Sequence, residues 1–328
     1  MRPNVVDLRP DSPKRLTLRV SVLDRCQYRC AYCRPGAVSP FFAREEWVSV
    51  DDYARLAPHF GAIGVNKVRF TGGEPLLRPD LPGVVRAFRD HIPDCHLALT
   101  TNGQLLDRKL DDLIEAGLTG ATVHIDSLRP ERYRALMGDG DVKLIVDALL
   151  RAQARLSEVK INTVMQRGKN VDEIGDFIAL SRSTGIEVRF IELMNTGSAV
   201  QYTKETFFTG REIVDAVRTL AGATPVERRS PSDPAALWQT DDGVVFGIIA
   251  SDTESFCAQC NRLRLTANGN LRGCLYQSAG IDLVEPLQRG SDDEIRARIL
   301  AAVSAKRSYH PDVMPKGRVR FSMAQTGG

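Results

Sequence analysis

The chain has 328 residues, of which 43% are hydrophobic and 26% charged, so it can enclose a large core and is expected to be globular. Its 44 Lys and Arg residues nearly balance its 41 Asp and Glu residues, which argues against a disordered charged tail and against nonspecific coating of nucleic acid. The longest apolar run, Val244–Ala250, is far shorter than the roughly 20 residues of a transmembrane helix, so no membrane span is expected. Met1–Leu16 lacks the apolar run of an export signal, which predicts a cytoplasmic protein.

From Leu16 to about Glu192, short β-rich runs alternate with amphipathic segments. The runs are Leu16–Leu23, Val65–Phe70, His96–Thr100, Ala121–Ile125, Val159–Val164 and Ile186–Ile191. The segments with helical spacing are Asp51–Ile63, Leu81–Arg89, Arg108–Glu115, Asp141–Arg155 and Val171–Ser183. This repeated β-α unit predicts parallel strands with helices outside. The six strands favour an open or partial barrel, and periodicity alone leaves a flat doubly wound sheet as the alternative.

The pattern changes after Glu192. The predicted elements are a helix at Gly210–Leu220, a strand at Val244–Ala250, a hairpin over Arg262–Leu275 and a helix at Asp292–Ala305, while Gly222–Pro234 has no periodicity. The hairpin is indicated by Asn268-Gly269 between alternating apolar runs, since Asn-Gly favours a turn with positive φ. We therefore predict an N-terminal extension over residues 1–15, a core over 16–195 and a C-terminal region over 196–328.

Three cysteines, Cys26, Cys30 and Cys33, follow the first predicted strand. Their thiolates can converge on one soft metal centre, and the loop after a barrel strand is where barrel enzymes place their chemistry. Three protein ligands on a four-iron cluster leave one iron open to bind a substrate. A zinc knuckle short of one ligand, or buried cysteines that bind no metal, are the alternatives.

A second triplet, Cys257, Cys260 and Cys274, flanks the predicted hairpin. It has no evident fourth ligand, which favours a second cluster with an open iron over a structural zinc site. Cys95 belongs to neither triplet and is interpreted as a buried or spare thiol. Seven cysteines are an odd number and too few for a disulfide scaffold at this length.

Basic side chains recur on the inward faces of the predicted strands. In Val65–Phe70 the period of two places Lys67 and Arg69 opposite Val68 and Phe70. The same reasoning points Arg19, Lys160 and Arg189 inward, and places Arg262 and Arg264 on one face of the hairpin. Each residue alone is more typical of a solvated or ion-paired side chain. Because unpaired buried cations are costly, their recurrence predicts a wet channel that holds a strongly anionic ligand such as a nucleoside triphosphate.

Two motifs resemble the radical S-adenosylmethionine (SAM) superfamily. The spacing Cys26-x3-Cys30-x2-Cys33 resembles its cluster signature, and Thr71-Gly72-Gly73-Glu74-Pro75 resembles the motif that cradles the methionine end of SAM. Two glycines at a strand end allow the backbone to approach a ligand closely. A narrower similarity, to the GTP 3′,8-cyclase family of molybdenum-cofactor biosynthesis, rests on Phe256–Thr266, on Cys274-Leu275 and on the terminal Gly327-Gly328. It runs from about Arg15 to the C-terminus.

This resemblance implies an α/β fold, a partial (β/α)6 TIM-type barrel of the radical SAM kind with a C-terminal extension that carries a second Fe–S cluster. It implies two [4Fe–4S] clusters, one on each cysteine triplet. The first would split SAM into methionine and a 5′-deoxyadenosyl radical that takes hydrogen from C3′ of GTP. The second would anchor the guanine while 3′,8-cyclo-7,8-dihydro-GTP forms. The implied partners are a one-electron donor such as a flavodoxin or ferredoxin, the downstream cyclic pyranopterin monophosphate synthase and a second copy in a homodimer.

The resemblance also assigns individual residues. The GTP contacts it implies are Arg19, Arg69, Thr100, Lys160, Arg262 and Arg264, to which the strand pattern adds Lys67 and Arg189. The residues assigned to catalysis are Arg262 and Arg264 with Gly327 and Gly328, which would form a tail that threads into the active site. The SAM contacts it implies are Tyr32, Gly73 and Met194.

The chain departs from the family pattern at two positions. His124 stands where the family usually has a serine that contacts SAM, and Arg34 stands where it usually has a methionine. An imidazole can still hydrogen-bond a ligand, so His124 is retained as a predicted SAM contact. The departures leave a diverged paralogue open. A peptide-modifying radical SAM enzyme and a noncatalytic zinc-binding interaction protein are the competing interpretations of the chain as a whole.

Overall fold

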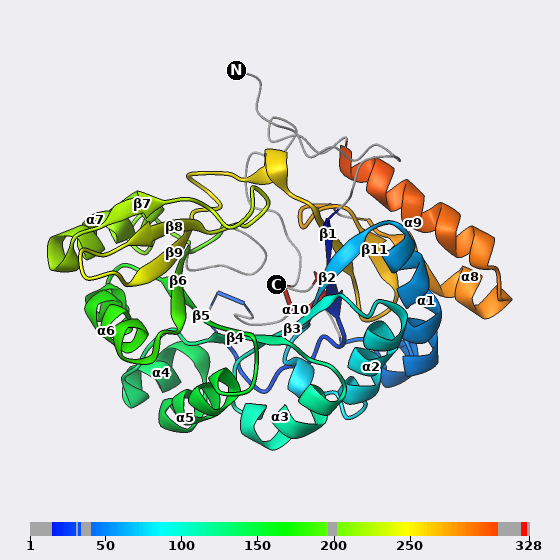
Figure 1. The fold of residues 1–328 in the computed structure, drawn as a ribbon, viewed down its shortest axis with the longest axis horizontal. Helices are drawn as coiled ribbons and strands as arrows, with labels where there is room; N and C mark the ends of the chain where they lie inside the picture. The colour runs from blue at the N-terminus through cyan, green and yellow to red at the C-terminus, as the bar shows by residue number, and fades with distance from the viewer. Residues whose placement is uncertain are drawn as a thin grey trace.

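The computed structural model describes residues 15–30, 32–33, 41–195, 202–277, 279–307 and 323–326. These residues form a 12-stranded sheet that curves around an interior without closing, with helices along its outer surface (Figure 1). The predicted N-terminal extension lies almost entirely outside the described residues, and Gly327 and Gly328 lie outside them too. No helix in the described part of the chain is long and apolar enough to cross a membrane.

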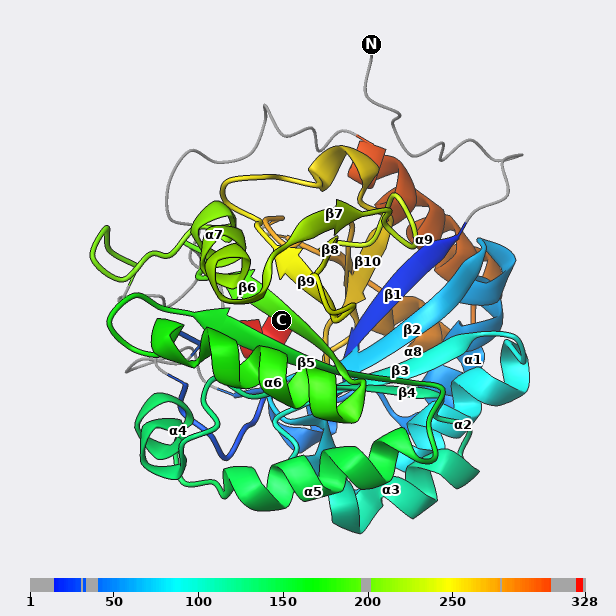
Figure 2. The same cartoon turned by 60° about the vertical axis from the view of Figure 1, so that its left-hand side comes forward.

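Six parallel strands in chain order form the centre of the sheet. They are β1 (Leu16–Ser21), β2 (Val65–Thr71), β3 (His96–Thr101), β4 (Gly120–His124), β5 (Glu158–Met165) and β6 (Glu187–Glu192). The helices between them are α1 (Val50–Ala62), α2 (Leu81–His91), α3 (Leu106–Glu115), α4 (Pro130–Met137), α5 (Val142–Gln153) and α6 (Ile174–Thr184). Figure 2 shows α3, α5 and α6 along the outer surface. Because the order never reverses, as it would in a doubly wound sheet, the predicted partial barrel is confirmed.

The alternation of side chains in β2 shows that the two faces of the curved sheet differ. One face packs against the helices, and the other faces the space that the sheet encloses. Val68 and Phe70 are fully buried, and the Phe70 ring lies 5.7 Å from that of Phe88 on α2. Lys67 and Arg69, on the opposite face, point away from the helices and line the interior. Helix α1 starts at a side-chain cap, because the Ser49 hydroxyl accepts a hydrogen bond from the Asp52 amide.

Additional strands extend both edges of the six-stranded centre. On one side β9 (Val245–Ile249) pairs in parallel with β6, followed by β8 (Ala236–Gln239) and β7 (Thr224–Val226), with α7 (Gly210–Ala221) preceding them in the chain. On the other side β10 (Arg262–Leu265) pairs in parallel with β1, followed by β11 (Asn270–Arg272) and β12 (Ile281–Asp282). The predicted regions 16–195 and 196–328 therefore share one sheet, and the boundary between them stays a prediction.

The C-terminal elements differ in part from the sequence prediction. The hairpin joins β10 to β11, but only Gly269 takes a positive φ, 77°, so Asn268-Gly269 is not a turn with positive φ at both positions. The short α8 (Val284–Arg289) precedes α9 (Asp292–Arg307), which packs against α1, β11 and β12. The last described element, α10 (Met323–Thr326), lies inside the curve of the sheet, where the Ala324 carbonyl accepts a hydrogen bond from the Ser21 hydroxyl at 3.0 Å (Figure 1).

Candidate active site

A cavity of about 660 Å³ fills the interior of the curved sheet. Its walls include all three cysteines of the first triplet and most of the predicted ligand contacts. The predicted residues that line it are Arg19, Cys26, Cys30, Tyr32, Cys33, Lys67, Arg69, Gly73, Thr100, His124, Arg189, Met194, Arg262 and Arg264. Lys160 and the second triplet are not among them, although Phe256, Asn261 and Leu275, next to the second triplet in the chain, are.

The first triplet lies on the loop that leaves β1, and its thiols are partly buried. The Cys26 sulfur accepts hydrogen bonds from the Tyr28 amide at 3.3 Å and from the Asn102 side-chain amide at 3.9 Å. Burial raises the pKa of the Cys26 thiol to about 12, and burial and the Cys33 thiol raise that of Cys30 well above its ordinary value. No three His, Cys, Asp or Glu side chains in the described residues surround a single-ion site. Three soft sulfur donors on one loop fit an iron–sulfur cluster.

The Gly72-Gly73-Glu74-Pro75 motif holds this loop against the end of β2. A Cβ on Gly73 would lie 2.1 Å from the Arg25 carbonyl oxygen, so only glycine fits there. The Gly73 amide donates to the Leu23 carbonyl at 3.0 Å, and the Glu74 amide donates to the Arg25 carbonyl at 2.8 Å. The close approach that the glycines permit is therefore to the backbone of the cysteine loop, beside the cavity.

The buried side chain of Glu74 holds the same motif in place. Its carboxylate is fully buried and accepts from the Thr101 hydroxyl and from the Asn102 amide, both at 2.7 Å, and from the Leu76 amide at 3.0 Å. Burial raises its pKa to about 7, although these three hydrogen bonds oppose the rise. Glu74 thus joins the end of β3 to the loop that follows β2.

His124, at the end of β4, belongs to a hydrogen-bonded trio with Tyr32 and Asp126. The Tyr32 hydroxyl donates to one Asp126 carboxylate oxygen at 2.6 Å and contacts the Nε2 atom of His124. That Nε2 atom lies 2.9 Å from the other Asp126 oxygen. Burial and the Asp126 carboxylate raise the pKa of Tyr32 well above its ordinary value, so this phenol is a hydrogen-bond donor. The trio fastens the end of the cysteine loop to β4 at the cavity wall.

The second triplet lies in cationic surroundings. Cys257 begins the short helical turn η4 (Cys257–Gln259), Cys260 directly follows it, and Cys274 lies after β11. The Cys260 sulfur accepts from the Lys306 ammonium at 3.4 Å and from the Arg262 guanidinium at 3.9 Å. Burial alone would raise the pKa of Cys260, but these two cations outweigh it and lower the pKa to about 7.

Three arginines of the cavity wall come from neighbouring strands and lie in register. Arg19 on β1 is opposite Arg69 on β2 and Arg264 on β10. Burial, together with the like charges around them, lowers the pKa of Arg19 and brings those of Arg69 and Arg264 to about 10. Arg69 donates to the Thr122 hydroxyl at 2.8 Å and the Thr100 hydroxyl at 3.2 Å. Such a concentration of buried like charge is stabilised by an anionic ligand.

The other predicted cations are already paired with acidic residues, which were not among the predicted site residues. Lys160 contacts Glu158, and Lys67 lies 3.4 Å from the same carboxylate. Arg189 lies 2.6 Å from Glu187 and 3.2 Å from Asp233. Glu158 and Glu187 each stand two residues before a cation that they pair with, so the period of two places them on the same strand face. That spacing is a signal that could have identified both acids.

Two further groups of residues lie at the edge of the cavity and beyond it. Met194 lines the cavity, and Arg262 is held at its edge by the Ser232 carbonyl at 2.9 Å and by the Phe256 ring, whose centroid is 4.8 Å from the guanidinium.

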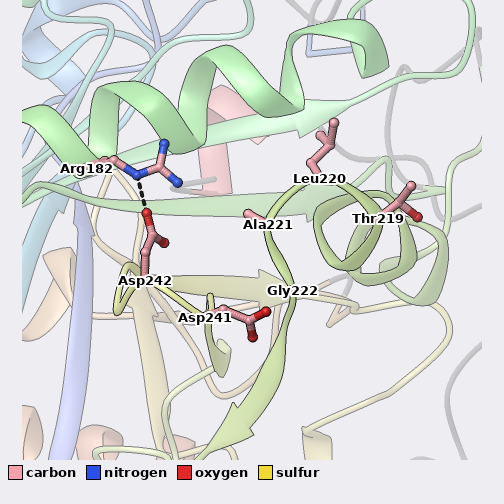
Figure 3. A pocket seen from close by; sticks show the side chains of 7 residues that line it. All are labelled: Arg182, Thr219, Leu220, Ala221, Gly222, Asp241 and Asp242. Carbon is pink, nitrogen blue, oxygen red and sulfur yellow. Dashed lines mark hydrogen bonds and ion pairs between the residues drawn. The ribbon is translucent and has the colours of Figure 1, made fainter.

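A separate pocket, lined by residues of α6, α7 and the turn after β8, contains none of the predicted site residues (Figure 3). Its Arg182 is bound to Asp242 at 2.5 Å.

Comparisons with known proteins match two consecutive parts of the chain. The profile of the radical SAM superfamily matches residues 20–180, and the profile Molybdenum Cofactor Synthesis C matches residues 186–311. GTP 3′,8-cyclase 1 of Mycobacterium tuberculosis is 40% identical over 279 residues, which are 84% of this chain and 78% of that protein. GTP 3′,8-cyclase of Pelotomaculum thermopropionicum is 37% identical over 315 residues, which are 95% of this chain and 97% of that protein.

A solved structure gives the corresponding likeness in fold. The crystal structure of Streptococcus suis SuiB bound to S-adenosylmethionine matches with a TM-score of 0.61 and 14% identity, over 88% of this chain and 68% of that one. The sequence relatives cover most of both chains. The resemblance noted in the sequence is confirmed: the chain belongs to the GTP 3′,8-cyclase family within the radical SAM superfamily.

Proposed function

We propose that this chain converts GTP to 3′,8-cyclo-7,8-dihydro-GTP, the first step of molybdenum-cofactor biosynthesis. The observation that carries the proposal is one cavity shared by the loop of Cys26, Cys30 and Cys33 and by the arginines of β1, β2 and β10. The cysteine loop supplies soft donors for a cluster, while the arginines supply the charge that a triphosphate requires.

The first part of the site would hold the cofactors. Cys26, Cys30 and Cys33 would ligate a [4Fe–4S] cluster, and SAM would lie against Gly73, Tyr32, His124 and Met194, all on the cavity wall. When bound and reduced, this pair supplies one-electron cleavage of SAM and, with it, abstraction of the C3′ hydrogen of GTP. The trio of Tyr32, His124 and Asp126 would keep the cysteine loop fixed to β4 during this step.

The second part of the site would hold the substrate. Arg19, Arg69 and Arg264 would neutralise the phosphates, with Thr100 and Thr122 orienting the Arg69 guanidinium. Lys67, Lys160 and Arg189 would act as an outer row, because Glu158, Glu187 and Asp233 already neutralise part of their charge. Such pairing fixes the direction of the cations before the ligand arrives.

The third part of the site is the second triplet. We propose that Cys257, Cys260 and Cys274 ligate a second [4Fe–4S] cluster whose open iron anchors the guanine, with Arg262 and Arg264 between this cluster and the phosphates. The Arg264 guanidinium also donates to the Thr326 carbonyl on α10 at 3.2 Å. That contact leads directly to Gly327 and Gly328, which we propose as a tail that enters the active site.

The remaining partners follow from the proposed reaction. A flavodoxin or ferredoxin would supply the electron, and a cyclic pyranopterin monophosphate synthase would receive the product. The seven free cysteines in the described residues suit the reducing cytoplasm. A homodimer is proposed on the family resemblance.

The experiment that tests the function is an anaerobic incubation of the reconstituted protein with dithionite, SAM and GTP. We expect mass spectrometry to detect 5′-deoxyadenosine and the cyclised nucleotide in equal amounts, with ATP in place of GTP as the matched control. Formation of 5′-deoxyadenosine without any cyclised nucleotide would contradict the proposed substrate. Absence of iron and acid-labile sulfide from the protein would contradict the whole mechanism.

A peptide-modifying radical SAM enzyme is the alternative that the fold comparison raises. A solved structure of SuiB bound to the precursor peptide SuiA matches with a TM-score of 0.60, but at 15% identity. Sequence relatives at 35–40% identity are named GTP 3′,8-cyclase instead, and the arginines of the cavity suit a compact anion. Calorimetry with GTP on the anaerobically purified protein separates the two, since the peptide-modifying alternative predicts no heat of GTP binding.

A further inference from the structure

A lysine occupies a position on α9 where the pattern of the helix requires an apolar residue. Ile295, Ile299 and Ala302 form the buried stripe of α9, and Lys306 continues that stripe at the same helical spacing. Its residue exposure is 8%, so its side chain lies in the interior with them. Lysine is rarely buried unless a partner compensates its charge.

The partners of Lys306 are a sulfur and a carbonyl. Its ammonium group donates to the Cys260 sulfur at 3.4 Å and to the Gly273 carbonyl at 2.9 Å. No ion pair joins it to a carboxylate in the described part of the chain. A neutral carbonyl and a neutral thiol would leave the charge uncompensated, whereas a thiolate ligand of a cluster would compensate it.

The packing of α9 fixes this contact. A Cβ on Gly273 would lie 3.0 Å from the Cβ of Lys306 and 3.1 Å from the Ala302 carbonyl oxygen, so the turn before Cys274 lies directly against the helix backbone. The backbone of Lys306 is therefore held beside the turn before Cys274, with its ammonium group in reach of Cys260. Arg262, at 3.9 Å from the same sulfur, adds a second positive charge on another side.

We propose that Lys306 is a positioning residue for the second cysteine triplet: its ammonium group orients the Cys260 sulfur and raises the reduction potential of the iron–sulfur centre held there. The inference rests on the proposed second cluster and goes beyond it by naming what sets its potential. A nearby positive charge and an N–H···S hydrogen bond both favour the reduced cluster, which carries one more negative charge. The centre would therefore be more easily reduced than one without this lysine.

The test isolates the second cluster in the full-length protein. A parent variant with Cys26→Ala, Cys30→Ala and Cys33→Ala removes the first cluster, so that the electron paramagnetic resonance signal comes from the second alone. On this parent we compare Lys306→Gln, which keeps a hydrogen-bond donor but removes the charge, with Lys306→Arg, which keeps the charge. Lys169→Gln, at an exposed lysine in a remote turn, is the matched control.

The readouts are iron and sulfide content and the midpoint potential from a redox titration. With the cluster intact, we expect Lys306→Gln to lower the ratio of reduced to oxidised cluster about tenfold at the parent midpoint, which is a shift of about 59 mV for a one-electron couple. Lys306→Arg is expected to stay within about threefold of the parent, because the charge is retained. Lys169→Gln should leave the ratio unchanged.

The results that would overturn the role of Lys306 differ from those that would overturn the proposed function. An unchanged midpoint in Lys306→Gln, or equal shifts in the Gln and Arg variants, would reduce Lys306 to a packing residue. If Lys306→Gln loses the cluster, retention in Lys306→Arg supports the proposal and loss in both overturns it. A parent without iron would instead refute the second cluster itself, whatever residue stands at 306.

Discussion

The two cysteine triplets lie in opposite electrostatic surroundings. The first is close to the carboxylates of Glu74 and Asp126, which raise the thiol pKa values of Cys26 and Cys30 beyond the effect of burial. The second is surrounded by Lys306, Arg262 and Arg264, and its Cys260 has a pKa lowered to about 7. Cysteine spacing alone gives no indication of this difference, because it comes from what the fold packs around each loop.

This contrast indicates which ligand the surroundings of each triplet suit. The first triplet shares its wall with acidic and neutral groups, which suit a cofactor that carries a sulfonium and an amino group. The second opens toward arginines, which suit a triphosphate. We call the part of the cavity beside the first triplet, which Glu74 lines, the negative end, and the part lined by Arg19, Arg69, Arg262 and Arg264 the positive end. The variants below alter one end at a time.

The largest expected effect separates the two centres directly. Cys33→Ala should abolish SAM cleavage, because the loop after β1 then offers only two ligands. Cys274→Ala should leave SAM cleavage measurable and abolish formation of the cyclised nucleotide. Both are assayed by mass spectrometry, together with iron content. Cys95→Ala, at a buried thiol outside both triplets, is the control and should keep both clusters. Loss of SAM cleavage in Cys274→Ala would contradict the division of labour.

The next effect concerns the positive end alone. The double variant Arg262→Ala, Arg264→Ala should lower the rate of GTP cyclisation by at least about 100-fold, since two charged donors aimed into a largely buried site are lost. Uncoupled SAM cleavage should persist, because both residues lie on β10, next to the second triplet, and not on the loop of Cys26, Cys30 and Cys33. The measurement is the ratio of 5′-deoxyadenosine to cyclised nucleotide.

Arg182→Ala, at the ion pair of the remote pocket in Figure 3, is the control for loss of an arginine. It should leave the product ratio at its wild-type value. Retained GTP turnover in the double variant would remove the role assigned to Arg262 and Arg264, and equal loss of SAM cleavage would show that the two ends of the cavity are not independent.

The affinity of the positive end for GTP is expected to depend on pH through Lys67. Burial and the Arg69 charge lower the pKa of Lys67 to about 8. Binding of a triphosphate favours the charged ammonium and so raises this pKa, which means that binding takes up a proton and weakens as pH rises past about 8. We expect GTP affinity of the holoenzyme to fall about fivefold from about pH 7.5 to about pH 9, measured by equilibrium dialysis.

Lys67→Gln should bind GTP more weakly below pH 8 and show a flatter profile, because the titrating group is gone. The exposed Lys143, on the outer helix α5, provides the matched Lys143→Gln control, which should keep the wild-type slope. A slope that survives in Lys67→Gln would assign the titration to another group of the cavity.

Much of this architecture could be predicted from the sequence, because its determinants are local. The period of two in Val65–Phe70 identified which face of β2 carries Lys67 and Arg69, and the glycines of the Gly-Gly-Glu-Pro motif indicated a close approach at the strand end. The strands β7 and β8 were not predicted, since they have three and four residues and are defined by their pairing rather than by their own pattern.

What escaped prediction depends on contacts between distant parts of the chain. Asp233 comes from a stretch without periodicity and reaches Arg189 only because the loop before β8 folds back over β6. Glu158 and Glu187 are different, because each stands two residues before the cation with which it pairs, a spacing that is visible in the sequence. Lys306 lies 46 positions from Cys260 and meets it only because α9 packs on the turn at Gly273.

The smallest expected effect concerns the negative end, at His124. His124→Ser introduces the residue that the family pattern favours and removes the ring that lies 2.9 Å from Asp126. The Tyr32 hydroxyl keeps its own bond to Asp126 at 2.6 Å, so the cysteine loop should stay fastened to β4. Loss of one hydrogen bond at the weak end of the ordinary range predicts a decrease in SAM affinity of about threefold, measured by calorimetry on the holoenzyme.

The control is His91→Ser on the outer helix α2, where the imidazole is hydrogen-bonded to the Ala87 carbonyl of its own helix, and it should not change SAM affinity. Tyr32→Phe provides the comparison, because it removes the hydroxyl that donates to Asp126 and contacts His124. If His124→Ser weakens SAM binding more than Tyr32→Phe does, the imidazole contacts the cofactor itself rather than supporting the loop. The negative end would then depend on a side chain that this chain does not share with its family pattern, and its selectivity for SAM would have to be explained through the imidazole.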